Sequence, residues 1–143
     1  MSQLRYTAKR NVQGQLVYVF SLRTDQRWMQ LEEFPSRALA RGEIHELILS
    51  ANPGLQPGAG VPDVAYVGFF EVEVGGIAEF GDEVWAGSHR LGTLAGFDLN
   101  HYPNHLNIVV AAGVASTGAD LGLDLGTSIR FQPAAGANPS TDS

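Results

Sequence analysis

Three of the four histidines of this 143-residue chain lie between residues 89 and 105, and two of them, His101 and His105, lie in its densest polar stretch. Residues 96–107 read Gly-Phe-Asp-Leu-Asn-His-Tyr-Pro-Asn-His-Leu-Asn and connect two apolar segments. The side chains that could do chemistry are Asp98, Asn100, His101, Asn104, His105 and Asn107. Polar groups are hard to satisfy inside a buried strand, so we expect this segment at a strand end, where functional residues often gather.

Acid–base catalysis is the first chemistry that this set suits. His101 or His105 would carry the proton, because imidazole titrates near neutral pH, and Asp98 would orient the ring. Asn104 or Asn107, with Asn100 beside them, would hydrogen-bond the substrate or a developing oxyanion. An isomerase, cyclase or lyase step fits best, because the sequence contains no nucleophile motif, nucleotide motif or redox centre, and we predict no cofactor.

Two other interpretations of the same segment stay open. A metal-dependent hydrolase would use His101 and His105, four residues apart, with Asp98 or Glu79 as an oxygen ligand, although Pro103 disfavours the helix that this spacing suits. In a purely structural role, the Asp and Asn side chains would cap turns and the histidines would bond backbone.

The remaining titratable residues suggest no site. His45 lies in the charged run Glu-Ile-His-Glu and is expected on the solvated surface. Glu71 and Glu73 alternate with apolar residues, which places them on the wet face of a strand.

Composition excludes several classes of function. Fifteen acidic and nine basic residues give a net charge of −6, which disfavours binding to nucleic acid or to an anionic membrane surface. The absence of cysteine excludes thiol catalysis, Cys-ligated zinc and disulfides. No apolar run approaches the roughly 20 residues of a membrane span, and no apolar region follows the basic start of the chain. We expect a cytoplasmic, bacterial homodimer that takes a small-molecule ligand.

The elements that must position these residues are short strands. The 17 glycines and 7 prolines suit strands and turns better than a helical bundle. β-Branched, aromatic and alternating patterns predict strands at 4–10, 15–23, 27–34, 66–74, 83–86, 89–97, 106–112 and 127–132. Gly92 and Gly96 are expected to mark bulges or close backbone contacts. We therefore predict a mainly β fold, a small closed or partly open β-barrel of 7–8 strands.

The other segments are expected to be a helix, a loop and a tail. Ser36 could cap a short helix through residues 37–50, with a strand over Ile44–Leu49 as the competing prediction. Residues 52–62 contain three prolines and three glycines and are expected to be a loop. We expect residues 1–132 to form one domain. Residues 133–143 contain only Ala, Gly, Asn, Pro, Ser, Thr and Asp, and we expect them to form a flexible tail.

Several glycine-marked stretches resemble the glucitol/sorbitol-specific IIA component of the sugar phosphotransferase system. They are Asn52–Gln56, Val74–Glu79, Leu91–Asp98, the strand from Pro103 to Gly113, and Leu125–Phe131, together about half of the chain. The resemblance implies a small β-barrel. That family carries a phosphoryl group on a histidine, and the corresponding region here, Val64–Phe70, contains none. A non-catalytic binding or regulatory relative of that barrel is thus the alternative to an acid–base enzyme.

Overall fold

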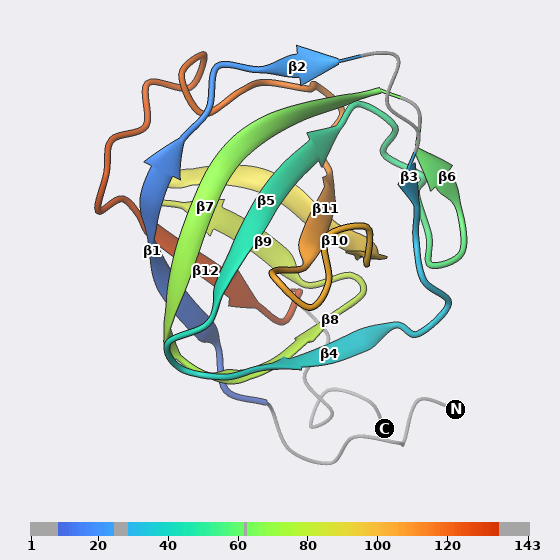
Figure 1. Cartoon of the computed structure of the whole chain (residues 1–143), viewed down its shortest axis with the longest axis horizontal. Helices are drawn as coiled ribbons and strands as arrows, with labels where there is room; N and C mark the ends of the chain where they lie inside the picture. Colours follow the sequence, from blue (N-terminus) through green and yellow to red (C-terminus); the bar gives the residue numbers. More distant parts are fainter. Residues whose placement is uncertain (1–8, 25–28, 62, 135–143) are drawn as a thin grey trace.

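The computed structural model describes residues 9–24, 29–61 and 63–134. These residues form strands, turns and loops, and no helix occurs among them (Figure 1). The strands are β1 (Val12–Val19), β2 (Arg23–Thr24), β3 (Met29–Gln30), β4 (Ser36–Leu39), β5 (Ile44–Ser50), β6 (Gly60–Val61), β7 (Val64–Val74), β8 (Gly76–Glu79), β9 (Glu83–Ala86), β10 (His89–Asp98), β11 (Asn107–Ala111) and β12 (Ser128–Gln132). The prediction of a mainly β fold is confirmed.

Seven strands close into a ring in the order β1, β12, β9, β10, β11, β5 and β7, with β7 returning to β1. Every neighbouring pair is antiparallel except β11 and β5, which run parallel. Register shifts at Gly92 and Gly96 confirm the two bulges expected in β10. The ring closes tightly at Gly68 of β7, where an added Cβ would lie 1.9 Å from the carbonyl oxygen of Tyr18. Only glycine allows that approach.

Two apolar clusters lie on opposite faces of the sheet. The first fills the ring and is built around Phe70, Phe97 and Phe131. The second lies outside the ring, where β3, β6 and the loop between β5 and β6 cover the outer faces of Ile48 and Val109. Burial on both faces explains why residues 47–49 of β5 and 108–111 of β11 are continuously apolar instead of alternating.

The predicted helix at 37–50 is wrong. This stretch forms β4 and β5, joined by a turn at Gly42 with φ of +91°. Leu47 packs inside the ring while Ile48 packs outside it, so neighbouring apolar residues imitate a helical face. The competing prediction of a strand over 44–49 is confirmed.

Other segments differ in pairing. Within the strand predicted at 27–34, Met29–Gln30 forms β3, which pairs with β6. β6 also interrupts the predicted loop at 52–62. Most of the strand predicted at 4–10 and of the tail predicted at 133–143 lies outside the described residues. In the part of the chain that the structure describes, no helix has the length and apolarity to cross a membrane.

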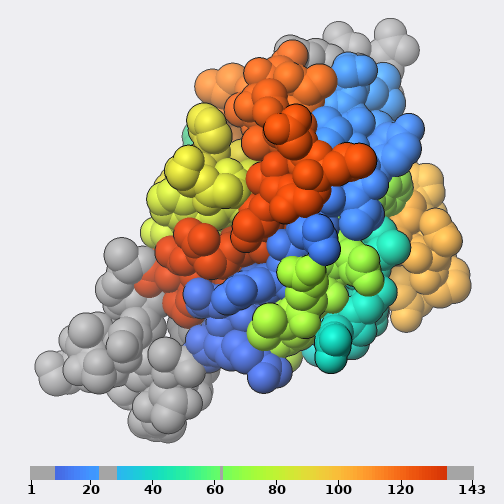
Figure 2. Space-filling view, turned by 90° about the vertical axis from the view of Figure 1, so that its left-hand side faces the viewer, coloured from blue at the N-terminus to red at the C-terminus, as the bar shows by residue number. Residues whose placement is uncertain are grey.

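The long connection between β11 and β12 packs Leu121 and Leu123 against the cluster inside the ring. Figure 2 shows β1 and β12 side by side on one face, with part of this connection above them. The shorter connection between β10 and β11 instead lies next to the turn that joins β4 and β5, as the residues of a shared pocket establish.

Candidate functional site

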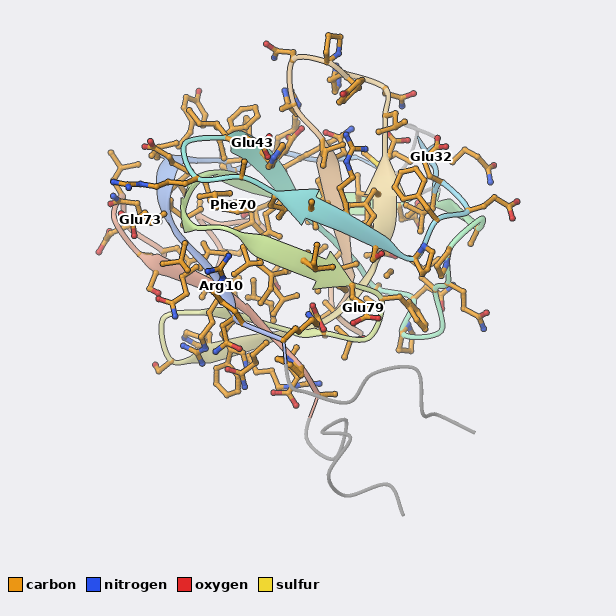
Figure 3. All side chains as sticks on the ribbon, turned by 90° about the horizontal axis from the view of Figure 1, so that it is seen from below. Arg10, Glu32, Glu43, Phe70, Glu73 and Glu79 are labelled. Atoms are coloured by element: carbon orange, nitrogen blue, oxygen red, sulfur yellow. The ribbon has the colours of Figure 1, made fainter. Side chains whose placement is uncertain are left out.

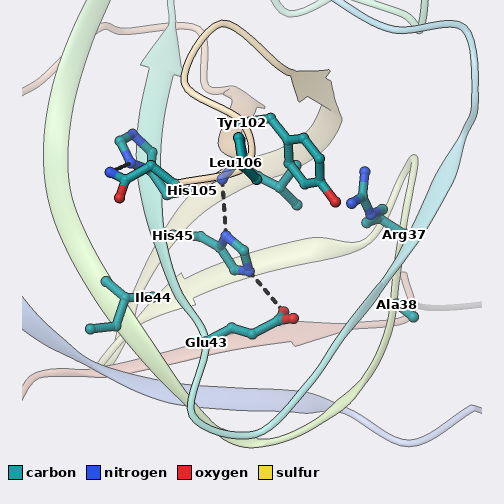
Figure 4. A pocket seen from close by; sticks show the side chains of 10 residues that line it. Arg37, Ala38, Glu43, Ile44, His45, Tyr102, His105 and Leu106 are labelled. Carbon is teal, nitrogen blue, oxygen red and sulfur yellow. Dashed lines mark hydrogen bonds and ion pairs between the residues drawn. The ribbon is translucent and has the colours of Figure 1, made fainter.

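A pocket of about 190 Å³ lies between the β4–β5 turn and the β10–β11 connection (Figure 4). We call it the site pocket. It is lined by Arg37, Ala38, Glu43, Ile44, His45, Tyr102, Pro103, Asn104, His105 and Leu106. Glu43 lies on the turn before β5 and Phe70 lies on β7; both are labelled in Figure 3, which looks at the molecule from below. The site pocket therefore takes residues from two segments that are about 60 positions apart in the sequence.

His45 is the most firmly held side chain of this pocket. It is 7% exposed, and its ring lies 6.3 Å from that of Phe70. Its Nδ1 accepts a hydrogen bond from the backbone N–H of Leu106 at 3.1 Å, and its Nε2 lies 3.0 Å from Glu43 Oε1. Because Nδ1 is an acceptor, the neutral ring carries its proton on Nε2 and donates it to the carboxylate. The prediction that His45 lies on the solvated surface is wrong.

Glu43 presents one oxygen to the protein and one to the pocket. Its Oε1 accepts both the His45 bond and a bond from the backbone N–H of Ala40 at 3.0 Å. Among the described residues, no hydrogen bond reaches its Oε2. Partial burial raises the pKa of Glu43. The hydrogen bonds from His45 and Ala40, together with the charges of His45 and Arg37, lower it by a larger amount, so the net pKa lies below its ordinary value. Glu43 is therefore an ionised, oriented acceptor at neutral pH.

Arg37 lies on the other side of the pocket. Its guanidinium carbon is 5.1 Å from the ring centre of Tyr102 and 5.8 Å from that of Phe34. Figure 4 shows Arg37 and Tyr102 pointing toward one another. The charge of Arg37 helps to lower the pKa of Glu43, yet no ion pair joins these two described residues.

His101 and His105, predicted as a pair, do come together. Their rings stack with centres 5.0 Å apart and planes 29° apart. The Nδ1 atom of His105 lies 3.0 Å from the side-chain nitrogen Nδ2 of Asn104. The Nε2 atom of His105 lies 3.4 Å from Glu46 Oε1. The carboxylate beside His105 is therefore that of Glu46 on β5.

Asp98 does not have the role that its position in the sequence suggests. It is 1% exposed, and its Oδ1 accepts bonds from Asn100 N at 2.9 Å and Asn107 Nδ2 at 3.0 Å. It thus fixes the two ends of the connection and bonds neither histidine. Asn107 is fully buried and Asn100 does not line the pocket, so Asn104 is the one predicted amide that does.

The metal interpretation lacks its third ligand. The described residues contain no group of three or more His, Asp or Glu side chains that could hold a metal ion. Asp98 is committed to Asn100 and Asn107, and Glu79 belongs to β8, which pairs with β4.

Sequence reasoning missed Arg37, Glu43 and His45. The signal that could have found His45 is strand alternation, because His45, Leu47 and Leu49 share one face and the two leucines are plainly apolar. A histidine on a buried face needs partners for both ring nitrogens, and Glu43, two residues earlier, is one of them.

One comparison with known proteins gives a match. A family model described as a family of unknown function (DUF6917) matches residues 6–132, which is most of the chain. No curated protein and no solved structure matches.

Proposed function

We propose that this chain, which belongs to the DUF6917 family of unknown function, binds a small organic molecule in the site pocket and exchanges a proton with it through Glu43. The observation that carries the proposal is the unequal use of the Glu43 oxygens. Two donors, His45 and the Ala40 N–H, fix Oε1, and Oε2 takes no hydrogen bond from the described residues. An oriented carboxylate with one free oxygen in a pocket is suited to accept a proton.

The proton would move between an atom of the ligand and Glu43 Oε2. Glu43 Oε2 takes a proton from a C–H or O–H of the ligand, the electron pair stays on the ligand, and Glu43 becomes a carboxylic acid. Return of the proton to a different ligand atom is an isomerisation, and loss of a leaving group from the ligand is a lyase step. His45 acts as a positioning residue, because both ring nitrogens already have hydrogen-bond partners. Nδ1 accepts a hydrogen bond from the Leu106 N–H, and Nε2–H donates one to Glu43.

His105 is the second candidate for proton transfer. It lines the same pocket, stacks on His101 at 5.0 Å and lies 3.4 Å from the carboxylate of Glu46. In this role the His101–His105 pair would return the proton that Glu43 removes. A small closed barrel related to the IIA component, and a homodimer, stay predictions from the sequence.

Ligand-observed NMR in D₂O tests binding and proton transfer together. The probes are a mixture of small carboxylic acids, polyols, amines and sugars, incubated with the wild-type chain, with Glu43→Gln and with Glu33→Gln. Glu33 is the matched control, since it is exposed and does not line the site pocket. Saturation transfer reports binding, and loss of a ligand C–H signal reports exchange with solvent deuterium.

We expect at least one probe to bind the wild-type chain and the Glu33 variant, and to lose a C–H signal with both. The Glu43 variant should cause no such loss. Binding without exchange would overturn the enzymatic part and favour the non-catalytic alternative. Unchanged binding and exchange by Glu43→Gln, or the absence of any binding, would overturn the proposal.

A further inference from the structure

We infer that the ligand of the site pocket is a small monocarboxylate that carries a hydroxyl or amino group next to its carboxylate. This inference rests on the proposed function and adds the chemical class of the molecule. It is carried by the contacts of Arg37, by the absence of an ion pair between Arg37 and Glu43 among the described residues, and by the size of the pocket.

The contacts of the Arg37 guanidinium are with two aromatic rings, which leaves its N–H groups for a ligand. Aromatic rings lie 5.1 Å and 5.8 Å from the guanidinium carbon, and neither can accept the five N–H bonds that this group offers in its own plane. Among the described residues, no hydrogen bond or ion pair uses those N–H groups. A planar guanidinium with unused N–H groups matches the two oxygens of a carboxylate.

Glu43 requires a hydrogen-bond donor on the same ligand. Its open Oε2 needs a donor, and an ionised carboxylate attracts a hydroxyl, an ammonium group or an acidic C–H. Arg37 and Glu43 line one pocket without pairing with each other. A molecule with an acceptor at one end and a donor at the other would bridge the two charges.

The pocket also limits the charge and size of the ligand. About 190 Å³ is below the ~300–1,000 Å³ typical of drug-sized ligand sites, so a molecule of a few carbons fits. One arginine beside one ionised carboxylate suits a single negative charge. A phosphate dianion would add repulsion from Glu43 without a second cation on the pocket wall.

The test uses three probes of similar size. Glycolate has both groups, acetate lacks the hydroxyl, and ethylene glycol lacks the carboxylate. Each is titrated into the ¹⁵N-labelled wild-type chain, Arg37→Gln, Arg37→Lys, Glu43→Gln and the control Arg90→Gln, and Kd is read from backbone amide shifts. Arg90 is exposed and does not line the pocket.

We expect glycolate to shift the amides of Asn104 and Leu106, and to bind at least about tenfold more tightly than acetate or ethylene glycol. Arg37→Gln should weaken glycolate about tenfold or more, and Arg37→Lys should weaken it less. Arg90→Gln should leave it unchanged.

Two outcomes separate this inference from the proposed function. If screened polyols or amines bind through Glu43 and Arg37→Gln leaves their binding unchanged, with no carboxylate bound, the ligand class is wrong while the proposed function stands. If glycolate binds through Arg37 and Glu43→Gln changes neither binding nor proton exchange, the proposed function is wrong, and so is the bridging geometry. Absence of amide shifts at millimolar concentrations of all three probes overturns the inference.

Discussion

Asn107 donates a hydrogen bond from Nδ2 to Asp98 Oδ1 at 3.0 Å, and the two residues face each other across β10 and β11. Both are fully or almost fully buried, and Asp98 also accepts the N–H of Asn100. Asp98→Ala leaves these donors without an acceptor. We expect it to lower the free energy of unfolding by about 1–3 kcal/mol, measured by urea denaturation.

Asp63→Ala is the control for this measurement, because Asp63 is exposed. It should change the stability of the fold very little. If Asp98→Ala is as stable as Asp63→Ala but abolishes ligand turnover, Asp98 orients a histidine, as the sequence suggested, and the structural assignment is wrong.

His45 should support both stability and the charge of Glu43. His45→Ala removes a buried ring and the acceptor of the Leu106 N–H. We expect a loss of about 2 kcal/mol or more in the free energy of unfolding. The pKa of Glu43, followed by ¹³C NMR of its carboxyl carbon, should rise because a hydrogen bond that lowers it is gone. An unchanged pKa in a folded variant would contradict the contact.

The stabilising effect of the Glu43 charge should depend on pH. The pKa of Glu43 is lower in the folded chain than in the unfolded chain, so the ionised group stabilises the fold above the unfolded pKa, about 4.3 for an ordinary glutamate. That contribution is lost as the pH falls through the folded pKa. The stability difference between wild type and Glu43→Gln, measured by thermal denaturation, should therefore be greatest near neutral pH and decline in acid. A difference that grows in acid would contradict this sign.

Lys9 and Asp82 form an ion pair of mostly buried side chains and give the opposite pH dependence. Burial raises the pKa of Asp82 by more than its bonds to Lys9 and the Glu79 N–H lower it, so the ionised carboxylate costs stability once the pH rises through its folded pKa. Lys9→Met removes the compensating cation and should destabilise the fold by up to about 3 kcal/mol at neutral pH. Denaturation at several pH values should show this loss shrinking in acid as Asp82 takes up a proton. A loss independent of pH would show that Lys9 acts through packing alone.

The fold was largely predictable because most strands end where glycine or a polar cluster interrupts them. β9, β10, β11 and β12 fall within about one residue of their predicted bounds. For β5 the first prediction was a helix, and a strand was the competing prediction. The helix was favoured because Leu47 and Ile48 are neighbouring apolar residues, and both are buried on opposite faces of the sheet. Periodicity carries no information where both faces are covered.

The site was predictable only in part. The 96–107 connection stood out because it gathers many polar residues, and it does supply Asn104 and His105 to the pocket. Asp98 was assigned to the wrong partner because proximity in the sequence does not show that its side chain pairs across to β11. Glu43 and His45 meet that connection only through the parallel pairing of β5 with β11, a contact between strands far apart in the chain.

The decisive measurement is a crystal structure of the chain grown with glycolate, because it shows whether Glu43 and Arg37 hold one ligand between them. We expect the glycolate hydroxyl within hydrogen-bond distance of Glu43 Oε2 and the glycolate carboxylate on the N–H groups of Arg37, while His45 still bonds Glu43 and Leu106. A site pocket that stays empty at saturating glycolate, or glycolate bound away from Glu43, would contradict it.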